Sequence, residues 1–389
     1  MLSGPNSLSP SDVLTAASSF VYGRLRRAAD DDPSWLGVDA LLEQPHLFGR
    51  LVRPAGRERF GSDDWGLVTA QVAREAISIL VTAAVHSWAT QRRLLDLSAA
   101  NVMLREDVSE GVVVGLRRLD VVVAPADPLS RPGDAPPPSP ASSPGPLGPA
   151  GSPEADELAG LAGAVEVMDD AKMFHRLVDR ALGTPLPIGM MPTGPADQVA
   201  AVAAIIATVR RTMRSGNRHL WGTAALALSS TLTHAEHTVG PRAGRDRAAL
   251  LAARPDLART IELVTVPATD TSTAPDPTSV LGSTAPDLTP GGTGITGSGT
   301  ALRPTDPGTT PDPTGSANSL GPGTTHGPAG VASPGPGATP DEITFALRRT
   351  CCLLVKLPSG AQCGTCSLRD RDTCVSLMTA WARGSLLRK

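Results

Sequence analysis

The cysteines are the residues of this chain whose type and spacing can support chemistry. There are five, all within the last 39 residues, and the first four have the spacing Cys-Cys-x10-Cys-x2-Cys. Cysteines that merely fill a core would be scattered along the chain, and a disulfide scaffold is typical of small secreted domains. The clustering therefore indicates one metal or redox site. The five residues are Cys351, Cys352, Cys363, Cys366 and Cys374.

The arrangement of the first four cysteines favours an iron–sulfur cluster. A Cys-x-x-Cys pair in a tight turn presents two thiolates to one metal, and Gly364 allows the turn to bend so that its amides donate to sulfur. The neighbouring side chains of Cys351 and Cys352 diverge on a helix and point to opposite faces of a strand, which is awkward for one tetrahedral zinc ion. A two-iron cluster presents its thiolate positions over a wider span. We therefore expect a [2Fe–2S] cluster, with a zinc knuckle and a cluster-free thiol site as alternatives; the expected ligands are Cys351, Cys352, Cys363 and Cys366.

The charge of this segment agrees with a cluster. Residues 341–389 carry eight Lys and Arg against four Asp and Glu, although the whole chain has a net charge of −3. An oxidised [2Fe–2S] cluster with four thiolates has a formal charge of about −2, so local cations would offset it and make reduction easier. The fifth cysteine, Cys374, falls in a helical pattern. We expect it to be a small apolar residue of that helix, and a role as alternate ligand is the other interpretation.

Proline and glycine divide the chain into an ordinary globular part and two insertions. Of 37 Pro and 39 Gly, the stretch 124–154 holds 11 Pro and 4 Gly, and the stretch 267–340 holds 14 of each. The second stretch has no Phe, Trp or Tyr, so it cannot bury enough apolar area to offset an ordering cost of roughly 1–2 kcal/mol per residue. We expect both stretches to be disordered linkers. The body then comprises 1–123 and 155–266, and the cysteine domain comprises 341–389.

Hydrophobic spacing predicts the elements that position the cysteines. Two β-branched runs, Val112–Val114 and Val121–Val123, predict two or three strands and are the only convincing sheet signal. We therefore predict an α+β fold that is mostly helical, with an α-rich body, a small sheet, a small C-terminal iron–sulfur domain and two disordered insertions. Helical patterns cover 11–29, 65–95, 155–182, 195–214 and 217–233, more weakly 244–265, and in the cysteine domain 343–350 and 372–387.

Two stretches resemble the ferric siderophore reductase family of the FhuF type. The C-terminal stretch has the family's Arg-rich start, its Cys-Cys-x10-Cys-x2-Cys pattern and a turn similar to CGTC. The stretch 218–228, RHLWGTAALAL, resembles the family's Trp-Gly-Asn/Thr-Ala helix, within a looser match over 195–233. The 74-residue stretch 267–340, directly before the cysteine domain, departs from the family pattern but leaves the ligand spacing intact.

The resemblance implies a cytoplasmic enzyme that reduces the Fe(III) of an imported siderophore, of the hydroxamate type. A [2Fe–2S] cluster would deliver the electron, and a ferredoxin or a flavoprotein reductase would supply it. Fe(III) is hard and binds hydroxamate oxygens far more tightly than Fe(II) does, so one electron weakens the complex. Such a protein needs no nucleophile or general base, which agrees with the lack of a triad-like motif. The candidate residues for docking the chelate are Arg218, Trp221, Arg348 and Arg349.

Two other classes of protein fit the same cysteines: an iron–sulfur binding or sensing protein that turns over no chelate, and a zinc-stabilised interaction module.

The net charge gives no reason to expect nucleic-acid binding. The start of the chain lacks the basic and apolar regions of a secretion signal. The most apolar windows, 76–85 and 199–209, are short beside the about twenty residues of a spanning helix. We expect a cytoplasmic protein with at most peripheral membrane association.

The remaining polar residues have structural interpretations. His86 lies in an apolar helix and is expected to be a satisfied core histidine. His234 and His237 are expected on a polar helix face, and Asp169 and Asp170 at a helix N-terminus. A basic cluster precedes Trp221-Gly222-Thr223, called the Trp-Gly-Thr patch below. We expect this cluster at a solvated helix end, and a dock for an anionic chelate or partner is the alternative. Its members are Arg210, Arg211, Arg214 and Arg218.

Overall fold

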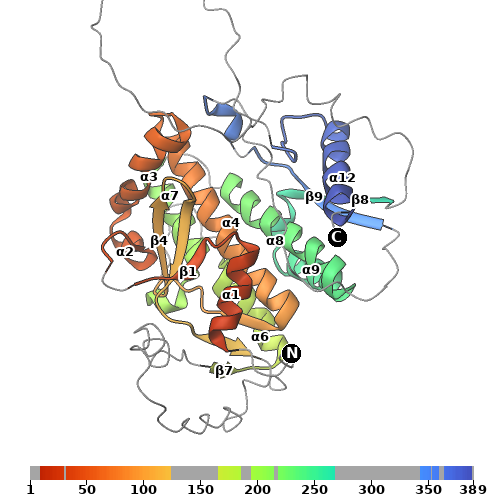
Figure 1. Ribbon diagram of the computed structural model, residues 1–389, viewed down its shortest axis with the longest axis horizontal. Helices are drawn as coiled ribbons and strands as arrows, with labels where there is room; N and C mark the ends of the chain where they lie inside the picture. The colour runs from red at the N-terminus through yellow and green to blue at the C-terminus, as the bar shows by residue number, and fades with distance from the viewer. Residues whose placement is uncertain are drawn as a thin grey trace, which may run out of the picture.

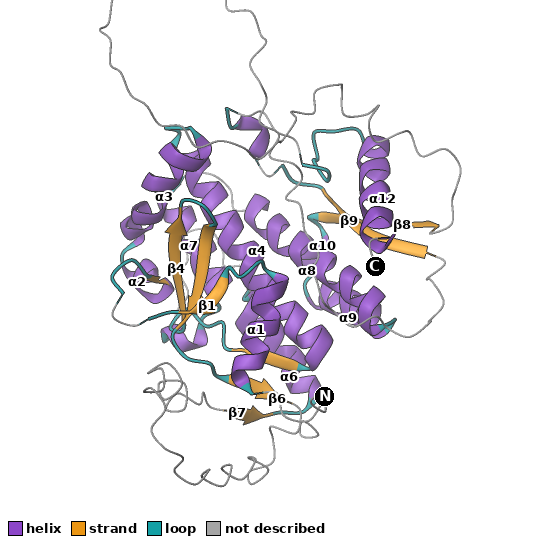
Figure 2. Cartoon of the chain, viewed as in Figure 1, coloured by secondary structure: helices purple, strands orange, loops and turns teal. Residues whose placement is uncertain are grey.

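The protein is α+β and mostly helical, as predicted (Figures 1 and 2). The predicted insertions lie outside the residues that the structure describes, apart from Pro267 at the start of the second one. The computed structural model describes residues 9–29, 32–123, 165–184, 194–213, 218–267, 342–351, 353–358 and 363–387.

Helices make up most of the body. The α-helices are α1 (Pro10–Phe20), α2 (Val38–Glu43), α3 (Gly49–Ala55), α4 (Trp65–Gln91), α6 (Asp170–Arg176), α7 (Ala201–Thr212), α8 (Arg218–Val239), α9 (Arg242–Ala253) and α10 (Pro255–Ala258). Short 3-10 and π segments are η1 (Pro45–Phe48), η2 (Gly56–Phe60), η4 (Leu177–Leu182) and η5 (Ala196–Gln198). The helices predicted over 65–95, 195–214 and 217–233 are therefore present.

The long helix α4 is the centre of the body. Its N-cap Asp64 accepts a hydrogen bond from the Leu67 backbone N–H at 2.9 Å, and the helix ends where Arg92 takes a left-handed conformation, with φ of 54°. α4 contacts α1, α7 and α8. Apolar and small residues cover most of its circumference, which is the pattern of a helix surrounded by other elements.

The length and composition of α4 also match those of a membrane-spanning helix. Its 18-residue apolar window has a mean hydropathy of 1.4, and 78% of that window is buried inside the protein. The apolar stretch is thus longer than the sequence windows indicated. Because the core helix of a soluble protein has the same properties, α4 is weak evidence for a membrane span.

The first predicted helix is shorter than expected. The pattern over 11–29 predicted one helix, but α1 ends at Phe20. Tyr22 and Gly23 both have positive φ, at 59° and 72°, and a right-handed helix cannot continue through them. The chain then enters a strand at Leu25, which is fully buried.

Two small sheets cover the body helices. The first has the order β1-β5-β4-β2, with β4 and β5 forming an antiparallel hairpin and β1 parallel to β5. The second has the order β3-β6-β7. The predicted strands around the two valine runs are present as β4, β5 and β6. The strands are β1 (Leu25–Arg27), β2 (Leu36–Gly37), β3 (Arg93–Leu95), β4 (Val102–Asp107), β5 (Gly111–Leu116), β6 (Val121–Val123) and β7 (Val165–Val167).

The segment before the cysteines is a strand, so the prediction of a helix over 343–350 is wrong. β9 (Glu342–Arg348) pairs antiparallel with β8 (Ile261–Pro267), and this also corrects the end of the helix predicted over 244–265. Phe345 faces a small core, whereas its neighbour Ala346 belongs to the large core of the body. With both faces buried, the segment lacks the alternation that identifies a strand. Of the helix predicted over 155–182, residues 155–164 lie outside the described residues, Val165–Val167 form β7 instead, and the helical part is present as α6 and η4.

The closing helix predicted over 372–387 is present as α12 (Arg371–Leu387). It packs on β9, where Val375 and Met378 contact a small core (Figure 1, blue). On its other side β9 contacts α8. The two-stranded sheet of β8 and β9 thus connects the cysteine domain to the body. The buried residues of the small core are Val264, Ile343, Phe345, Leu347 and Cys374.

Candidate functional site

Cys351, the first residue of the first cysteine pair, follows closely after β9. Cys351 is half-buried, and its Sγ accepts a hydrogen bond from the Leu353 backbone N–H at 3.3 Å. Leu353 has φ of 65° and ψ of 0°, a left-handed conformation that costs a non-glycine residue about 1–3 kcal/mol. Its strained backbone therefore directs an amide at the Cys351 sulfur. Cys352 lies outside the described residues.

The second pair forms the tight turn that the sequence predicted. The Cys366 backbone N–H donates to the Cys363 carbonyl at 3.0 Å, and the Arg369 N–H donates to the Cys366 carbonyl at 3.1 Å. Cys363 is half-buried, with Sγ 3.8 Å from Thr365 Oγ1, and Cys366 is buried. A short 3-10 segment, η6 (Leu354–Lys356), lies between the two pairs.

Cys374 is a buried residue of α12, as predicted. It is 3% exposed, and its thiol donates to the Cys366 carbonyl at 3.4 Å. Burial raises the pKa of the Cys374 thiol, which favours the protonated form and agrees with its role as a donor. Cys374 therefore joins α12 to the CGTC turn.

The described cysteines are chemically suited to a thiolate-bound cofactor. Cys351, Cys363, Cys366 and Cys374 are all free thiols. Among the residues that the structure describes, no group of three or more Cys, His, Asp or Glu side chains is gathered around one point. The four-cysteine site stays a prediction. The donor set fits it, because the free thiols include one that accepts an amide N–H and two in a turn of the expected type.

The Trp-Gly-Thr patch of α8 contacts the segment directly before Cys351. Arg348 Nη1 donates to Thr223 Oγ1 at 3.2 Å. A Cβ atom built on Gly222 would lie less than 3.0 Å from Thr350 Oγ1, so only glycine allows this approach. The two stretches that carry the resemblance, far apart in the sequence, therefore meet in the structure. Sequence spacing gave no signal for this contact.

The four candidate docking residues divide into two buried and two exposed. Trp221 is 6% exposed and Arg348 is 8% exposed. The Trp221 indole N–H is buried without a hydrogen-bond partner among the described residues, and the Arg254 guanidinium lies 5.1 Å over the ring. Arg218 and Arg349 are exposed. Trp221 and Arg348 thus serve packing between α8 and β9, and the exposed arginines are the ones that a docked molecule can reach directly.

One arginine of the basic cluster at the end of α7 makes a hydrogen bond within the fold. Arg211 Nη1 donates to the Leu42 carbonyl at 3.1 Å, although the side chain is exposed. Arg214 lies outside the described residues. Asp169 is the N-cap of α6, as predicted, with Oδ1 accepting from the Lys172 N–H at 2.8 Å.

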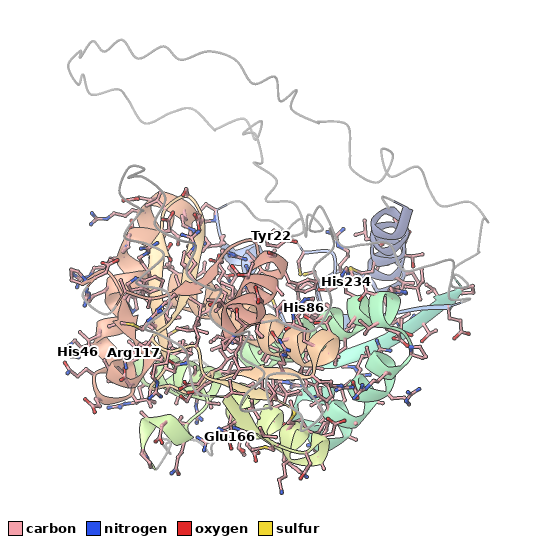
Figure 3. All side chains as sticks on the ribbon, turned by 60° about the horizontal axis from the view of Figure 1, so that its bottom comes forward. Tyr22, His46, His86, Arg117, Glu166 and His234 are labelled. Atoms are coloured by element: carbon pink, nitrogen blue, oxygen red, sulfur yellow. The ribbon has the colours of Figure 1, made fainter. Side chains whose placement is uncertain are left out.

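His86 differs from the expectation of a satisfied core histidine. Its ring stacks on Phe20 at 4.1 Å, and Nδ1 is buried with no hydrogen-bond partner in the described part of the chain. Burial, with a smaller effect of His234, lowers the pKa of His86 to about 4. Phe20 also contacts His234, at 5.1 Å between ring centroids; Figure 3 labels His86 and His234.

A buried charge cluster in the body was not anticipated from the sequence. Arg59 contacts both Glu75, at 2.5 Å, and Glu106. The Glu106 side chain is 3% exposed, and its Oε2 has no hydrogen-bond partner among the described residues. Burial outweighs the attraction of the shared guanidinium and raises the pKa of Glu106 to about 7. Charged residues on three separate elements carry no spacing signal, so the sequence could not reveal this cluster.

Comparisons with known proteins do not extend the resemblance. No family model, no curated protein and no solved structure matches the chain. The resemblance therefore depends on the cysteine spacing and the Trp-Gly-Thr patch alone.

Proposed function

We propose that this protein is a [2Fe–2S] ferric-siderophore reductase of the FhuF type, acting in the cytoplasm. One observation carries the proposal. The two stretches that resemble the family, separated by more than a hundred residues, contact each other through Gly222 and Thr350, next to Cys351. Unrelated matches would have no reason to meet. The contact therefore supports treating them as parts of one site.

A bound [2Fe–2S] cluster supplies one-electron transfer. The residues of the chain would hold and tune it. The thiolates of Cys351, Cys352, Cys363 and Cys366 would be its ligands. The Leu353 N–H donates to the Cys351 sulfur; with Cys351 as a ligand, this hydrogen bond would lower the electron density on the sulfur and so favour the reduced state. Cationic side chains of the segment offset negative charge in the same direction.

The substrate requires an exposed, positively charged surface beside the ligands. Arg218 lies one helical turn before Gly222, on the same face of α8. Gly222 contacts Thr350, whose neighbour Arg349 is exposed. Both arginines therefore lie close to the place where α8 meets the cysteine segment. Guanidinium groups there can bind the oxygens of an anionic chelate.

The net reaction moves one electron from a carrier protein to Fe(III) in the chelate, and a cluster held by the four cysteines would supply this one-electron chemistry. The iron becomes Fe(II), which hard oxygen ligands bind less tightly, and no covalent bond to the protein forms. No proton transfer by a protein side chain is needed. This agrees with a site made of thiols and arginines rather than of paired acids and bases.

A single-turnover experiment tests the function. The full chain is reconstituted anaerobically, reduced with dithionite, freed of excess reductant and mixed with a ferric hydroxamate. We expect loss of the reduced spectrum and release of one Fe(II) for each cluster oxidised, captured by a ferrous-specific chelator. The Ga(III) hydroxamate has the same shape but cannot be reduced, and it should leave the spectrum unchanged. A reduced protein that is stable in the presence of the ferric chelate would leave only a binding or sensing role.

Replacing an exposed arginine tests the docking surface. Arg349→Ala should lower the second-order rate constant for oxidation by the ferric chelate severalfold, with the cluster content unchanged. Lys356→Ala is the matched control, because Lys356 is also exposed but lies on η6 rather than beside Thr350. Equal rates for both variants would contradict the assignment of Arg349.

A further inference from the structure

The position of Cys351 depends on a contact between α8 and the residues that follow β9. We infer that Gly222 and Thr350 set this position, so that Thr350 is a positioning residue for the candidate ligand Cys351. The contact would let the body of the protein control where Cys351 lies.

Position 222 has no room for a side chain. A Cβ atom there would lie less than 3.0 Å from Thr350 Oγ1, a separation that real Cβ contacts essentially never show. Thr350 is 8% exposed, so turning its side chain moves the hydroxyl or the methyl group against other packed atoms. Relief would therefore come from a movement of α8 and the segment apart, and the segment continues directly into Cys351.

Two neighbouring contacts hold the same segment to the body. Arg348 Nη1 donates to Thr223 Oγ1 at 3.2 Å, and the Arg349 backbone N–H donates to the Thr260 carbonyl at 2.8 Å. Both come from residues directly before Thr350. A shift of Thr350 away from α8 therefore strains these hydrogen bonds, and the Arg349 amide reports that shift.

The Thr350 hydroxyl contributes volume rather than a hydrogen bond. Its Oγ1 is buried and has no partner among the described residues. An unpaired buried hydroxyl is destabilising by about 1–3 kcal/mol, and valine has nearly the same shape. Thr350→Val should therefore keep the contact and leave the Arg349 amide as protected as in the wild type.

The distances also predict a compensating pair. After Thr350 Oγ1, the nearest atoms to a Cβ at position 222 are Thr350 Cβ at 3.4 Å and Thr260 Cβ at 3.7 Å, which are ordinary van der Waals separations. Thr350→Ala removes the hydroxyl and methyl groups. The double variant Gly222→Ala/Thr350→Ala should therefore restore the close approach that Gly222→Ala alone prevents.

Hydrogen exchange of the metal-free full chain tests the contact. In Gly222→Ala we expect the Arg349 amide to exchange at least tenfold faster than in the wild type, and in the double variant to return to within threefold of it. Gly66→Ala, in α4, is the matched control, because a Cβ there meets nothing closer than 3.4 Å. Unchanged exchange in Gly222→Ala, or no recovery in the double variant, would overturn the inference. If Gly222→Ala is insoluble, the double variant decides: it must be soluble and protected.

The cluster gives a second readout, which rests on the proposed function. In the reconstituted protein, Gly222→Ala should change the midpoint potential and the electron paramagnetic resonance line shape, and the double variant and Thr350→Val should restore both. A generally weakened fold would not be corrected by a second truncation. A wild type that takes up no cluster would contradict the proposed function, whereas the exchange experiment would still decide the role of the contact.

Discussion

The body and the cysteine domain differ in the size of their hydrophobic cores. The body has one large core that runs from α1 through α4 to α8, and it even encloses the Arg59–Glu75–Glu106 cluster. Within the described residues, the cysteine domain contributes four buried residues, among them Cys374, to a small core that Val264 of β8 completes. Stabilisation by apolar burial grows with the buried area, so the large core stabilises the body more than the small core stabilises the cysteine domain. The cysteine domain is also held by the contact of β9 with α8.

Removing one ligand should give the largest difference between the two regions. Cys363→Ser should abolish the visible absorbance and all reductase activity, because a serine oxygen is a poor substitute for a thiolate ligand. Hydrogen exchange should rise around residues 351–370, while α4 stays protected, since metal binding contributes to the folding of small metal domains. Full absorbance in this variant would remove Cys363 from the ligand set.

The matched control for that variant is Cys374→Ala. Cys374 is buried in the small core and is not an expected ligand. We expect its absorbance per chain to equal that of the wild type, with a modest loss of stability.

Removing a buried charge from the body should give the next largest effect. The loss of stability should be confined to the body. Arg59→Met removes the cation that Glu75 and Glu106 share and leaves Glu75 only the more distant Arg24, at 3.9 Å, at a cost of about 3–5 kcal/mol in the free energy of unfolding. Arg26→Met is the control, because its ion pair with Glu110 is about 40% exposed and such pairs contribute roughly 0–1 kcal/mol. Urea unfolding measures both. Similar losses in the two variants would mean that the buried cluster contributes no more than a surface pair.

The pKa of Glu106 should make the stability of the body depend on pH. The folded-state pKa of about 7 lies above the ordinary value of 4.5, so the folded state holds the proton more tightly. The stabilisation is fully present below pH 4.5 and is lost as the pH rises through about 7. Glu106→Gln should flatten this dependence, and the exposed Glu110→Gln should not. A wild type and Glu106→Gln with parallel stability curves over this range would contradict the assignment.

Shortening the connection between the two strands should have the smallest effect. Pro267 and Glu342 are directly opposite each other in the β8–β9 pair, so a short turn can join the strands. Deleting 270–338 should leave folding and cluster content nearly unchanged. A shorter loop closes at lower entropic cost, and the expected gain is at most about 2 kcal/mol. Thermal unfolding and iron content check this. An insoluble, colourless product would show that the deleted stretch is structural.

The sequence predicted the helices and strands whose hydrophobic pattern lies within one continuous stretch of the chain. Long apolar repeats predicted α4, α8 and α12, and the valine runs predicted β4, β5 and β6. The pairing of β8 with β9 was missed, because the strands are far apart in the sequence and β9 is buried on both faces.

The candidate site was predictable to a similar extent. The CGTC turn and the burial of Cys374 follow from local residue types, and both are present. The contact of Gly222 with Thr350 depends on tertiary packing, which spacing does not encode. The same holds for Trp221 and Arg348, whose residue types favoured a docking surface but which the fold buries between α8 and β9.

Electron paramagnetic resonance of the anaerobically reconstituted and reduced full chain tests the central claim most directly. A [2Fe–2S] cluster on the four cysteines predicts the signal of one unpaired electron per chain, absent before reduction and absent in Cys363→Ser. A protein that remains colourless and silent after reconstitution with iron and sulfide, or that retains only zinc, would contradict the account.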